Sequence, residues 1–394
     1  MSYAPTMILS PLVNRSHVTM KILPVKTVVE YPLPAAGQTH EILAVSDKLL
    51  LISQQTDGSL VKVALDTNGR PTGARKWAVT NPWSGLHGLT LQSTSCGPIV
   101  WATVQFDNAI LQIDPNGDDI NAEPQVKRTI PIPSPASGPH GVLENNGNLW
   151  ISCKSSSHVV RISISKQDDH QIWAVSGRPI FIAVHPTSRD VFSGLDLSSK
   201  IWQYKNDGKS GQEIAIPPER GTTPVGLVAG PDDNVWVALL GNSTTGTGTF
   251  GRINKDASID WFTMSSAIGS TASLIHMAFD REQTGRLWML GSSIACASSV
   301  NAIFTVDIDD ISTGGTAKPR IARQNSIVLP TQRSAAHRVI SHKGSLYVTE
   351  LTTSTLAHIS GAAVGGLDDS ETWDQFADYG LGLKAVYSSY DNTV

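Results

Sequence analysis

A sequence motif recurs along this chain with a period of about 50 residues. The clearest copy reads Gly138-Pro139-His140-Gly141-Val142-Leu143 and, after a turn, Gly147-Asn148-Leu149-Trp150-Ile151-Ser152. Seven positions align with the histidine of that copy: His40, His87, His140, Ile180, Val225, His276 and His337. A repeat of this length cannot bury its apolar surface alone, so neighbouring copies must stack on one another.

Each copy also carries the apolar patterns of short strands. The second expected strand ends on an apolar pair in every copy: Leu50-Leu51, Val100-Trp101, Leu149-Trp150, Val191-Phe192, Val235-Trp236, Leu287-Trp288 and Leu346-Tyr347. The third strand alternates apolar and polar residues, which is typical of a half-buried strand. A fourth segment often ends in proline, a residue tolerated at a sheet edge because no partner needs its missing N–H.

Four strands repeated seven times predict an all-β fold, a seven-bladed β-propeller with four-stranded antiparallel blades. A six-bladed ring is the alternative, in which the degenerate copy at 181–204 would form something else. We expect an N-terminal extension at 1–25, a single propeller domain at 26–376 and a C-terminal tail at 377–394. Segment 27–34 is expected to pair with the last blade and close the ring, and segment 372–376 competes for that role.

Composition excludes several classes of partner. A net charge of -4 over 394 residues offers no electrostatic reason to bind nucleic acid. No stretch is apolar enough to act as a signal peptide or to span a membrane. The three cysteines (Cys96, Cys153 and Cys296) suggest neither a disulfide framework nor a zinc pair. We therefore expect a cytoplasmic protein.

The aligned histidines form the first candidate site. The inner strands of a propeller begin at one mouth of the central channel, where ligands usually bind, so these side chains are expected to converge there. Ile180 and Val225 replace histidine in two adjacent copies. This predicts a rim that is polar on one side and apolar on the other, which suits a hydrocarbon-like ligand. The alternative for each histidine is a turn cap that bonds a neighbouring backbone group.

The sequence motif around His140 resembles the repeat of the virginiamycin B lyase family of propellers. This repeat runs through essentially the whole chain. That resemblance implies an enzyme that opens a cyclic depsipeptide by elimination, with a histidine general base and a Mg²⁺ held by carboxylates. His337 and Glu350 match the motif of a histidine at the start of one strand and a glutamate at the end of the next. His276 matches the position of a further active-site histidine.

This chain also departs from the family pattern. Ser334-Ala335-Ala336 stands where an acidic residue is expected before the last histidine, and Leu290-Gly291-Ser292 carries no acid either. A single carboxylate is a poor Mg²⁺ site, because Mg²⁺ prefers near-octahedral oxygen ligation. In size, repeat and eroded metal site the chain resembles fungal propellers of secondary metabolism, the hetero-Diels–Alderases that join a tropolone o-quinone methide to a humulene-type sesquiterpene.

Three functions stay open at this point. The favoured one is a cofactor-independent intermolecular hetero-Diels–Alder cyclisation in natural-product biosynthesis, acting on apolar terpenoid and tropolone-like small molecules. The second is a Mg²⁺-dependent lyase on a cyclic ester or depsipeptide, with Glu350 as metal ligand and His337 as base. The third is a non-enzymatic propeller scaffold.

These possible functions assign catalytic and binding roles to individual residues. Glu350 could orient the His337 imidazole. Arg338 could bind an acidic enol or tropolone oxygen, and a rim salt bridge is its structural alternative. The predicted catalytic residues are His337, Glu350, His276 and Arg338. The predicted substrate-binding residues are His40, His87, His140, Ile180, Val225, Gln105 and Lys154. The favoured function needs no cofactor, and the lyase alternative needs Mg²⁺.

Overall fold

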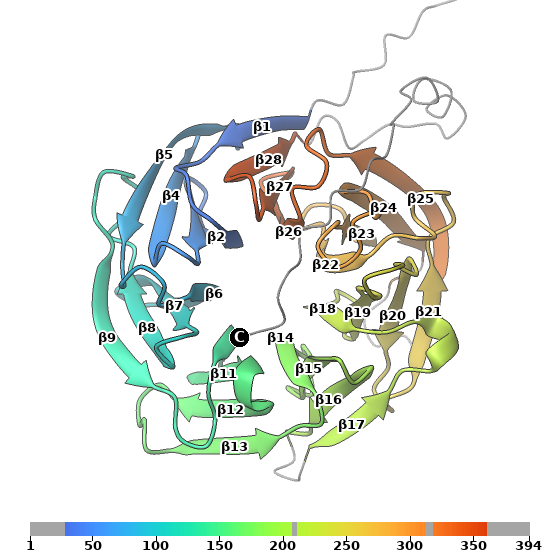
Figure 1. Ribbon diagram of the computed structural model, residues 1–394, viewed down its shortest axis with the longest axis horizontal. Coiled ribbons are helices and arrows are strands. Elements are labelled where there is room, and N and C mark those ends of the chain that lie inside the picture. Colours follow the sequence, from blue (N-terminus) through green and yellow to red (C-terminus); the bar gives the residue numbers. More distant parts are fainter. Residues whose placement is uncertain (1–27, 207–210, 310, 312–317, 361–394) are drawn as a thin grey trace, which may run out of the picture.

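The computed structural model describes residues 28–206, 211–309, 311 and 318–360. These residues form seven four-stranded antiparallel sheets arranged as blades around a central axis (Figure 1). The predicted seven-bladed propeller is therefore confirmed, and the six-bladed alternative is wrong. The degenerate copy at 181–204 forms an ordinary blade.

The seven blades are numbered here in chain order. Blade 1 comprises β2 (Thr39–Ser46), β3 (Leu49–Gln54), β4 (Ser59–Leu65) and β5 (Pro71–Ala78). Blade 2 comprises β6 (Leu86–Thr94), β7 (Gly97–Val104), β8 (Ala109–Asp114) and β9 (Gln125–Pro131). Blade 3 comprises β10 (Pro139–Asn145), β11 (Asn148–Cys153), β12 (His158–Ser163) and β13 (His170–Ala174).

Blade 4 comprises β14 (Arg178–Val184), β15 (Val191–Asp196), β16 (Lys200–Tyr204) and β17 (Gln212–Ala215). Blade 5 comprises β18 (Pro224–Ala229), β19 (Val235–Leu239), β20 (Thr249–Ile253) and β21 (Ile259–Thr263). Blade 6 comprises β22 (Leu274–Phe279), β23 (Arg286–Gly291), β24 (Ala302–Asp309) and β25 (Arg320–Val328). Blade 7 comprises β26 (Ala336–His342), β27 (Ser345–Glu350), β28 (Thr355–Ile359) and β1 (Val28–Pro32).

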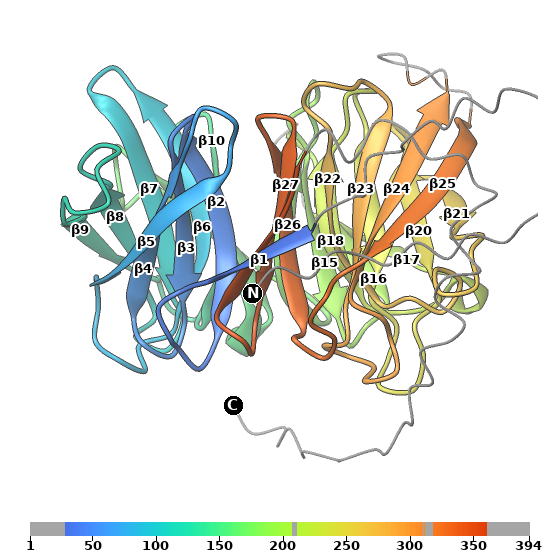
Figure 2. The same ribbon diagram turned by 90° about the horizontal axis from the view of Figure 1, so that it is seen from above.

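The ring is closed by its first strand. β1 pairs antiparallel with β28 and forms the outer edge of blade 7, as predicted for segment 27–34 (Figures 1 and 2). The competing segment 372–376 lies outside the described residues. Strands from the two ends of the described chain therefore share one sheet.

Apolar side chains fill the spaces between blades. Trp101, Trp236 and Trp288 are fully shielded from solvent in the buried apolar clusters. Burying an aromatic side chain removes a large apolar area from water and stabilises the stack of blades. The described residues contain two short 3₁₀ helices, Lys154–Ser156 (η1) and Pro218–Arg220 (η2). None of their helices has the length and hydropathy needed to cross a membrane.

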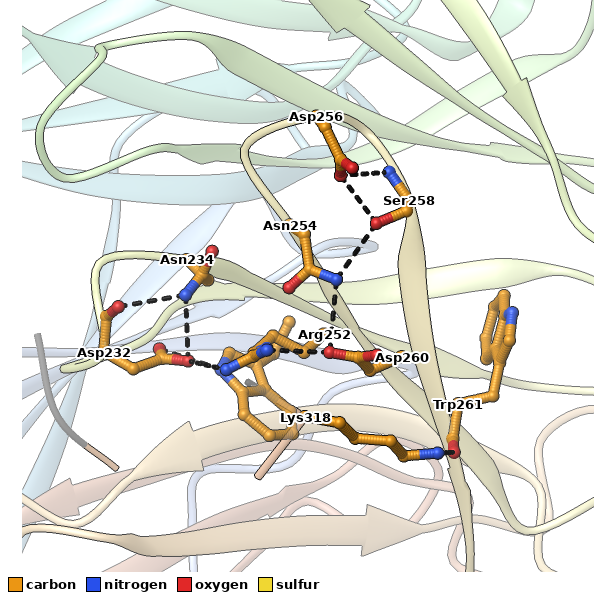
Figure 3. Close-up of polar contacts among 10 residues, drawn as sticks. Asp232, Asn234, Arg252, Asn254, Asp256, Ser258, Asp260, Trp261 and Lys318 are labelled. Carbon is orange, nitrogen blue, oxygen red and sulfur yellow. Dashed lines mark hydrogen bonds and ion pairs between the residues drawn. The ribbon is translucent and has the colours of Figure 1, made fainter. Parts of the chain in front are cut away.

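A charged network fixes the outer part of blade 5 (Figure 3). Arg252 on β20 donates to Asp260 at 2.7 Å and lies 3.6 Å from Asp232 in the turn before β19. The Asp232 carboxylate also accepts the Trp236 indole N–H at 3.1 Å and an Asn234 amide N–H at 3.2 Å. Every charge in this network has an opposite partner, so we assign it to stability and not to ligand binding.

Candidate functional site

The site begins with an irregularity that every inner strand shares. In blade 3, Pro139 pairs with Cys153 and Gly141 pairs with Ser152, which leaves His140 between them without a ladder partner. Such a bulge directs a side chain out of the regular alternation of the strand. We call this residue of each blade the ring position.

The register identifies the ring position in all seven blades. It is the first residue inside the register shift that interrupts the pairing near the start of each inner strand. The seven residues are His40, His87, His140, Ile180, Val225, Ile275 and His337. The alignment that placed His276 here was wrong by one residue, because Leu274 pairs with Gly291 and His276 with Leu290, which leaves Ile275 unpaired.

The ring is divided into two continuous halves. Histidine occupies it in blades 7, 1, 2 and 3, and an aliphatic residue occupies it in blades 4, 5 and 6. Ile180, Val225 and Ile275 belong to one buried apolar cluster together with Phe181. The predicted polar and apolar sides are therefore present, and the apolar side has three members instead of two.

The four imidazoles of the polar half pack against one another. The ring centroids of His87 and His140 lie 3.8 Å apart, those of His40 and His87 4.2 Å, and those of His40 and His337 4.6 Å. His40 Nε2 bonds the Gln38 side-chain oxygen at 3.2 Å. The Nδ1 atoms of all four are buried and have no hydrogen-bond partner among the described residues. This arrangement provides polar atoms that a bound molecule can satisfy.

The environment keeps these imidazoles neutral. Burial, reinforced by the positive charge of Arg338, lowers the pKa of His40 to about 3. Burial also lowers the pKa of His87, His140 and His337 well below the ordinary histidine value, and the neighbouring imidazoles and Arg338 add to the effect. A neutral imidazole donates one N–H and accepts at its other nitrogen, so the polar half can hydrogen-bond an uncharged ligand without carrying charge itself.

A second layer follows one residue further along each inner strand. It comprises Glu41, Gly88, Gly141, Phe181, Gly226, His276 and Arg338. Glycine is required in three blades because an added Cβ would lie 2.5 to 2.9 Å from a carbonyl oxygen of the next blade. Only four side chains therefore occupy this layer, and they come from blades 1, 4, 6 and 7.

Arg338 is the centre of the second layer. Its guanidinium forms an ion pair with Glu41, donates to the His337 carbonyl at 3.1 Å and lies 3.6 Å from the centroid of the Phe181 ring. Burial raises the pKa of Glu41, and the adjacent guanidinium opposes that rise. His276 Nδ1 accepts the Val339 backbone N–H at 3.3 Å. Arg338 is thus a buried, paired cation inside the propeller and not an exposed rim residue.

Hydroxyl groups that the sequence analysis missed hold the ring backbone in place. Ser53, Thr103, Ser152 and Thr349 each donate to the carbonyl of the ring residue in the next blade, at 2.6, 2.9, 2.6 and 2.6 Å respectively. They lie in the four blades that carry a ring histidine, whereas Gly194, Ala238 and Leu290 occupy this place in blades 4, 5 and 6. The recurring Ser or Thr one residue before the end of the second strand was the available sequence signal.

Glu350 is placed apart from the histidine that it was expected to orient. It pairs with Ala336 across the sheet, and it accepts a hydrogen bond from the Thr353 hydroxyl at 3.1 Å. Burial and the nearby negative charge of Glu30 raise its pKa to about 7. Within the described residues no hydrogen bond or ion pair joins Glu350 to His337.

The remaining predicted residues lie just outside the ring. Gln105 and Lys154 both directly follow the last residue of a second strand, as does Gln55 in blade 1. The Gln55 amide donates to the Gln105 side-chain oxygen at 3.1 Å. Lys154 lies close enough to His140 and His40 for its charge to lower their pKa values. Polar residues thus lie beside the ring where the second strands of blades 1, 2 and 3 end.

The donor set does not fit the Mg²⁺ of the lyase alternative. Among the described residues no group of three or more His, Cys, Asp and Glu side chains is arranged to hold a metal ion. Glu41 is paired with Arg338, and Glu30 lies close enough to Glu350 for its negative charge to raise the pKa of Glu350. The described residues therefore offer no Mg²⁺ site.

Comparison with known proteins bears on the fold. No family model and no curated protein sequence matches the chain. Virginiamycin B lyase from Staphylococcus aureus is a structural neighbour with a TM-score of 0.63 and 17% identity, covering 85% of this chain and 99% of that one. A catalytically inactive variant of that lyase, solved with quinupristin, gives a TM-score of 0.64 at the same identity and coverage. Hydrazine synthase from Kuenenia stuttgartiensis gives 0.62 at 12% identity, covering 88% and 99% of the two chains. At these identities the chain is similar to virginiamycin B lyase in its propeller fold.

Proposed function

We propose that this protein is a natural-product biosynthetic enzyme that catalyses a cofactor-independent intermolecular hetero-Diels–Alder cyclisation. Its substrates would be a tropolone o-quinone methide and a humulene-type sesquiterpene. The observation that supports this best is the division of the ring into four neutral histidines and three aliphatic residues. An oxygen-bearing diene suits the polar half, and a hydrocarbon alkene suits the apolar half.

Binding both partners at one ring would supply much of the catalysis. Holding two reactants in a near-attack pose removes about 7–11 kcal/mol of the barrier to a bimolecular reaction. The buried side chains of Ile180, Val225 and Ile275 offer no polar atom that would compete with the diene for its partner. The halves of the ring would thus orient the two substrates relative to each other.

Hydrogen bonding would lower the barrier further. Electron density moves onto the carbonyl oxygen of the diene as the new bonds form, and a neutral imidazole N–H can donate to that oxygen. Fixed donors in a site shielded from water stabilise developing charge more than solvent does. Because their pKa values are lowered, His337 and His276 are weak bases. We assign His337 to donation and His276 to a supporting position beside Phe181.

The test is a cyclisation assay with both partners in the presence of EDTA. We expect product formation at an unchanged rate after chelation, and a strict requirement for added Mg²⁺ would overturn the proposal. An o-quinone methide also reacts spontaneously, so product stereochemistry is compared with a reaction containing a His87→Leu, His140→Leu variant. Loss of stereochemical control in that variant is the expected result.

The structural likeness to virginiamycin B lyase supports a second candidate, a lyase on a cyclic ester or depsipeptide. In that reading His337 would remove a proton from the substrate and Glu350 would be the acid of the motif, without a Mg²⁺ site, since the described residues do not provide one. Glu350→Gln should then abolish turnover of a cyclic depsipeptide such as quinupristin. Unchanged turnover in this variant, or none in the wild type, argues against this candidate.

A further inference from the structure

Lys154 stands at a fixed place beside the ring. It opens η1 directly after Cys153, and its backbone N–H donates to the Gly138 carbonyl at 2.9 Å. Gly138 has φ +67, and a Cβ there would lie 2.0 Å from the Ser155 hydroxyl oxygen. The Ser137 N–H donates to the Ser156 hydroxyl at 2.8 Å. These contacts hold η1 against the loop that leads into His140.

The Lys154 amine differs from the other shielded lysines in having no bonded partner among the described residues. Each other lysine that is buried or half-buried in that part of the chain donates to a protein oxygen. These are Lys62 to four carbonyl oxygens, Lys76 to Asp57 at 2.7 Å, Lys200 to Glu213 at 2.8 Å and Lys343 to the Asp47 carbonyl at 3.4 Å. An amine with no bonded partner remains available to a ligand.

The charges around Lys154 favour its neutral form. Burial lowers the pKa of Lys154, and the positive charge of Arg178 on β14 lowers it further. Asp196 on β15 acts in the opposite direction, but its carboxylate is bonded to Arg178 at 2.6 Å. On the channel side the neighbours are His140 on β10 and His40 on β2, both uncharged. A desolvated lysine beside another cation is a recognised setting for a nucleophilic amine.

We infer that Lys154 is a carbonyl-capturing amine, which forms a reversible Schiff base with an apolar aldehyde or ketone bound at the ring. The ligand class follows from the surroundings, because Lys154 directly follows Cys153, which pairs with Pro139 beside His140, and the ring continues into aliphatic residues. This activity goes beyond the proposed cyclisation and does not depend on it.

The step balances with the groups at hand. The amine lone pair attacks the carbonyl carbon, and the C=O π electrons move onto oxygen, which receives the proton lost from nitrogen. Solvent can carry that proton from nitrogen to oxygen, because Lys154 is only half-buried. The carbinolamine then loses water as the nitrogen lone pair forms the C=N bond. Hydrolysis reverses both steps and releases the ligand.

Reductive trapping tests the inference on the whole protein. Benzaldehyde with cyanoborohydride converts a Schiff base into a stable benzylamine, and peptide mass spectrometry locates it. Near neutral pH we expect Lys154 to be labelled faster than Lys200, because burial lowers the pKa of Lys154 and its amine has no bonded partner among the described residues, whereas the Lys200 amine donates to Glu213. Labelling of Lys154 no faster than that of Lys200 would overturn the inference.

Two variants separate the amine from its surroundings. Lys154→Arg keeps the positive charge and should lose the fast-labelled position, whereas Lys200→Arg should leave it intact. Arg178→Gln removes the neighbouring cation and frees Asp196, so labelling of Lys154 should slow at the same pH. An unchanged rate in Arg178→Gln also contradicts the inference, provided that thermal unfolding shows the variant to be folded. Since the labelling uses neither cyclisation substrate, failure of the cyclisation assay would leave its result standing.

Discussion

The guanidinium of Arg338 in blade 7 lies 3.6 Å from the centroid of the Phe181 ring in blade 4, three blades away around the propeller. Glu41 of blade 1 pairs with the same guanidinium. One side chain thus connects three blades across the central axis, directly beside the ring of histidine and aliphatic residues.

This connection predicts a strong dependence of stability on its ion pair. Arg338→Met leaves the Glu41 carboxylate buried without a partner, which should lower the free energy of unfolding by about 3–5 kcal/mol. The double variant Glu41→Gln, Arg338→Met should be more stable than Arg338→Met alone. Urea unfolding of the four proteins in this double-mutant cycle measures the coupling, and simple additivity would contradict a buried pair.

The ring histidines predict a loss of stability in acid. Their pKa values are lowered in the folded protein, so below about pH 6.5 the unfolded chain binds protons that the folded chain does not. The free energy of unfolding should therefore fall as the pH decreases toward 3, by up to about 1.4 kcal/mol per pH unit for each histidine. Replacing His87 and His140 by leucine should make that slope shallower in unfolding experiments between these pH values.

Glu350 predicts the opposite trend in a higher pH window. Its pKa is raised from 4.5 to about 7, so the folded chain binds more protons than the unfolded chain between these values, and stability falls as the pH rises through them. Glu350→Gln removes this dependence. The variant should gain about 3 kcal/mol relative to wild type on going from pH 4 to pH 8. A constant difference between the two proteins would contradict the raised pKa.

The hydroxyl groups that bond between blades should stabilise the fold in the blades that carry a ring histidine. Thr349→Val keeps the side-chain shape but removes the donor to the His40 carbonyl, so it should lower the free energy of unfolding by about 1–3 kcal/mol. Ala238→Ser in blade 5 is the matched control, because it adds a hydroxyl group at the equivalent position of a blade that has none. Equal stability of Thr349→Val and wild type would show that the bond at 2.6 Å contributes little.

Activity variants distinguish the cyclisation from the scaffold reading. His337→Leu removes the N–H assigned to donate to the diene oxygen and should reduce kcat by roughly 100-fold, the usual effect of losing one fixed donor to a developing charge. Ile275→Leu preserves the apolar half and should leave kcat close to wild type. Full biological activity in a His140→Ala, His276→Ala, His337→Ala variant would instead support a scaffold that does not use the channel.

The blade count could be read from the sequence, because every copy repeats the same spacing of apolar pairs. Segment 27–34 is the expected ring-closing strand, but 372–376 is an open alternative on sequence alone, and the pairing of β1 with β28 came from the structure. The ring residue of blade 6 could not be identified from the sequence. Both Ile275 and His276 fit the repeat, and only the strand register decides between them. The separation of His337 from Glu350 has a similar origin. Glu350 pairs with Ala336, so the bulge that carries His337 falls outside that pairing.

The Arg338 contacts were also beyond sequence reasoning. Glu41 lies 297 residues away in the chain and Phe181 lies in a third blade, so no local spacing connects them. The inter-blade hydroxyl groups were visible as repeated Ser and Thr residues, but their role depends on a carbonyl supplied by the following blade.

The pairing of β1 with β28 has a consequence for how the molecule is made. The strand that completes blade 7 is synthesised before the other described strands, and its partner at Thr355–Ile359 follows more than 300 residues later. Blades 1 to 6 can each form from consecutive strands as they emerge, but the circle stays open until synthesis has passed residue 359. The contact of His337 in blade 7 with His40 in blade 1 lies across that opening, so the set of four histidines is completed only when the circle closes.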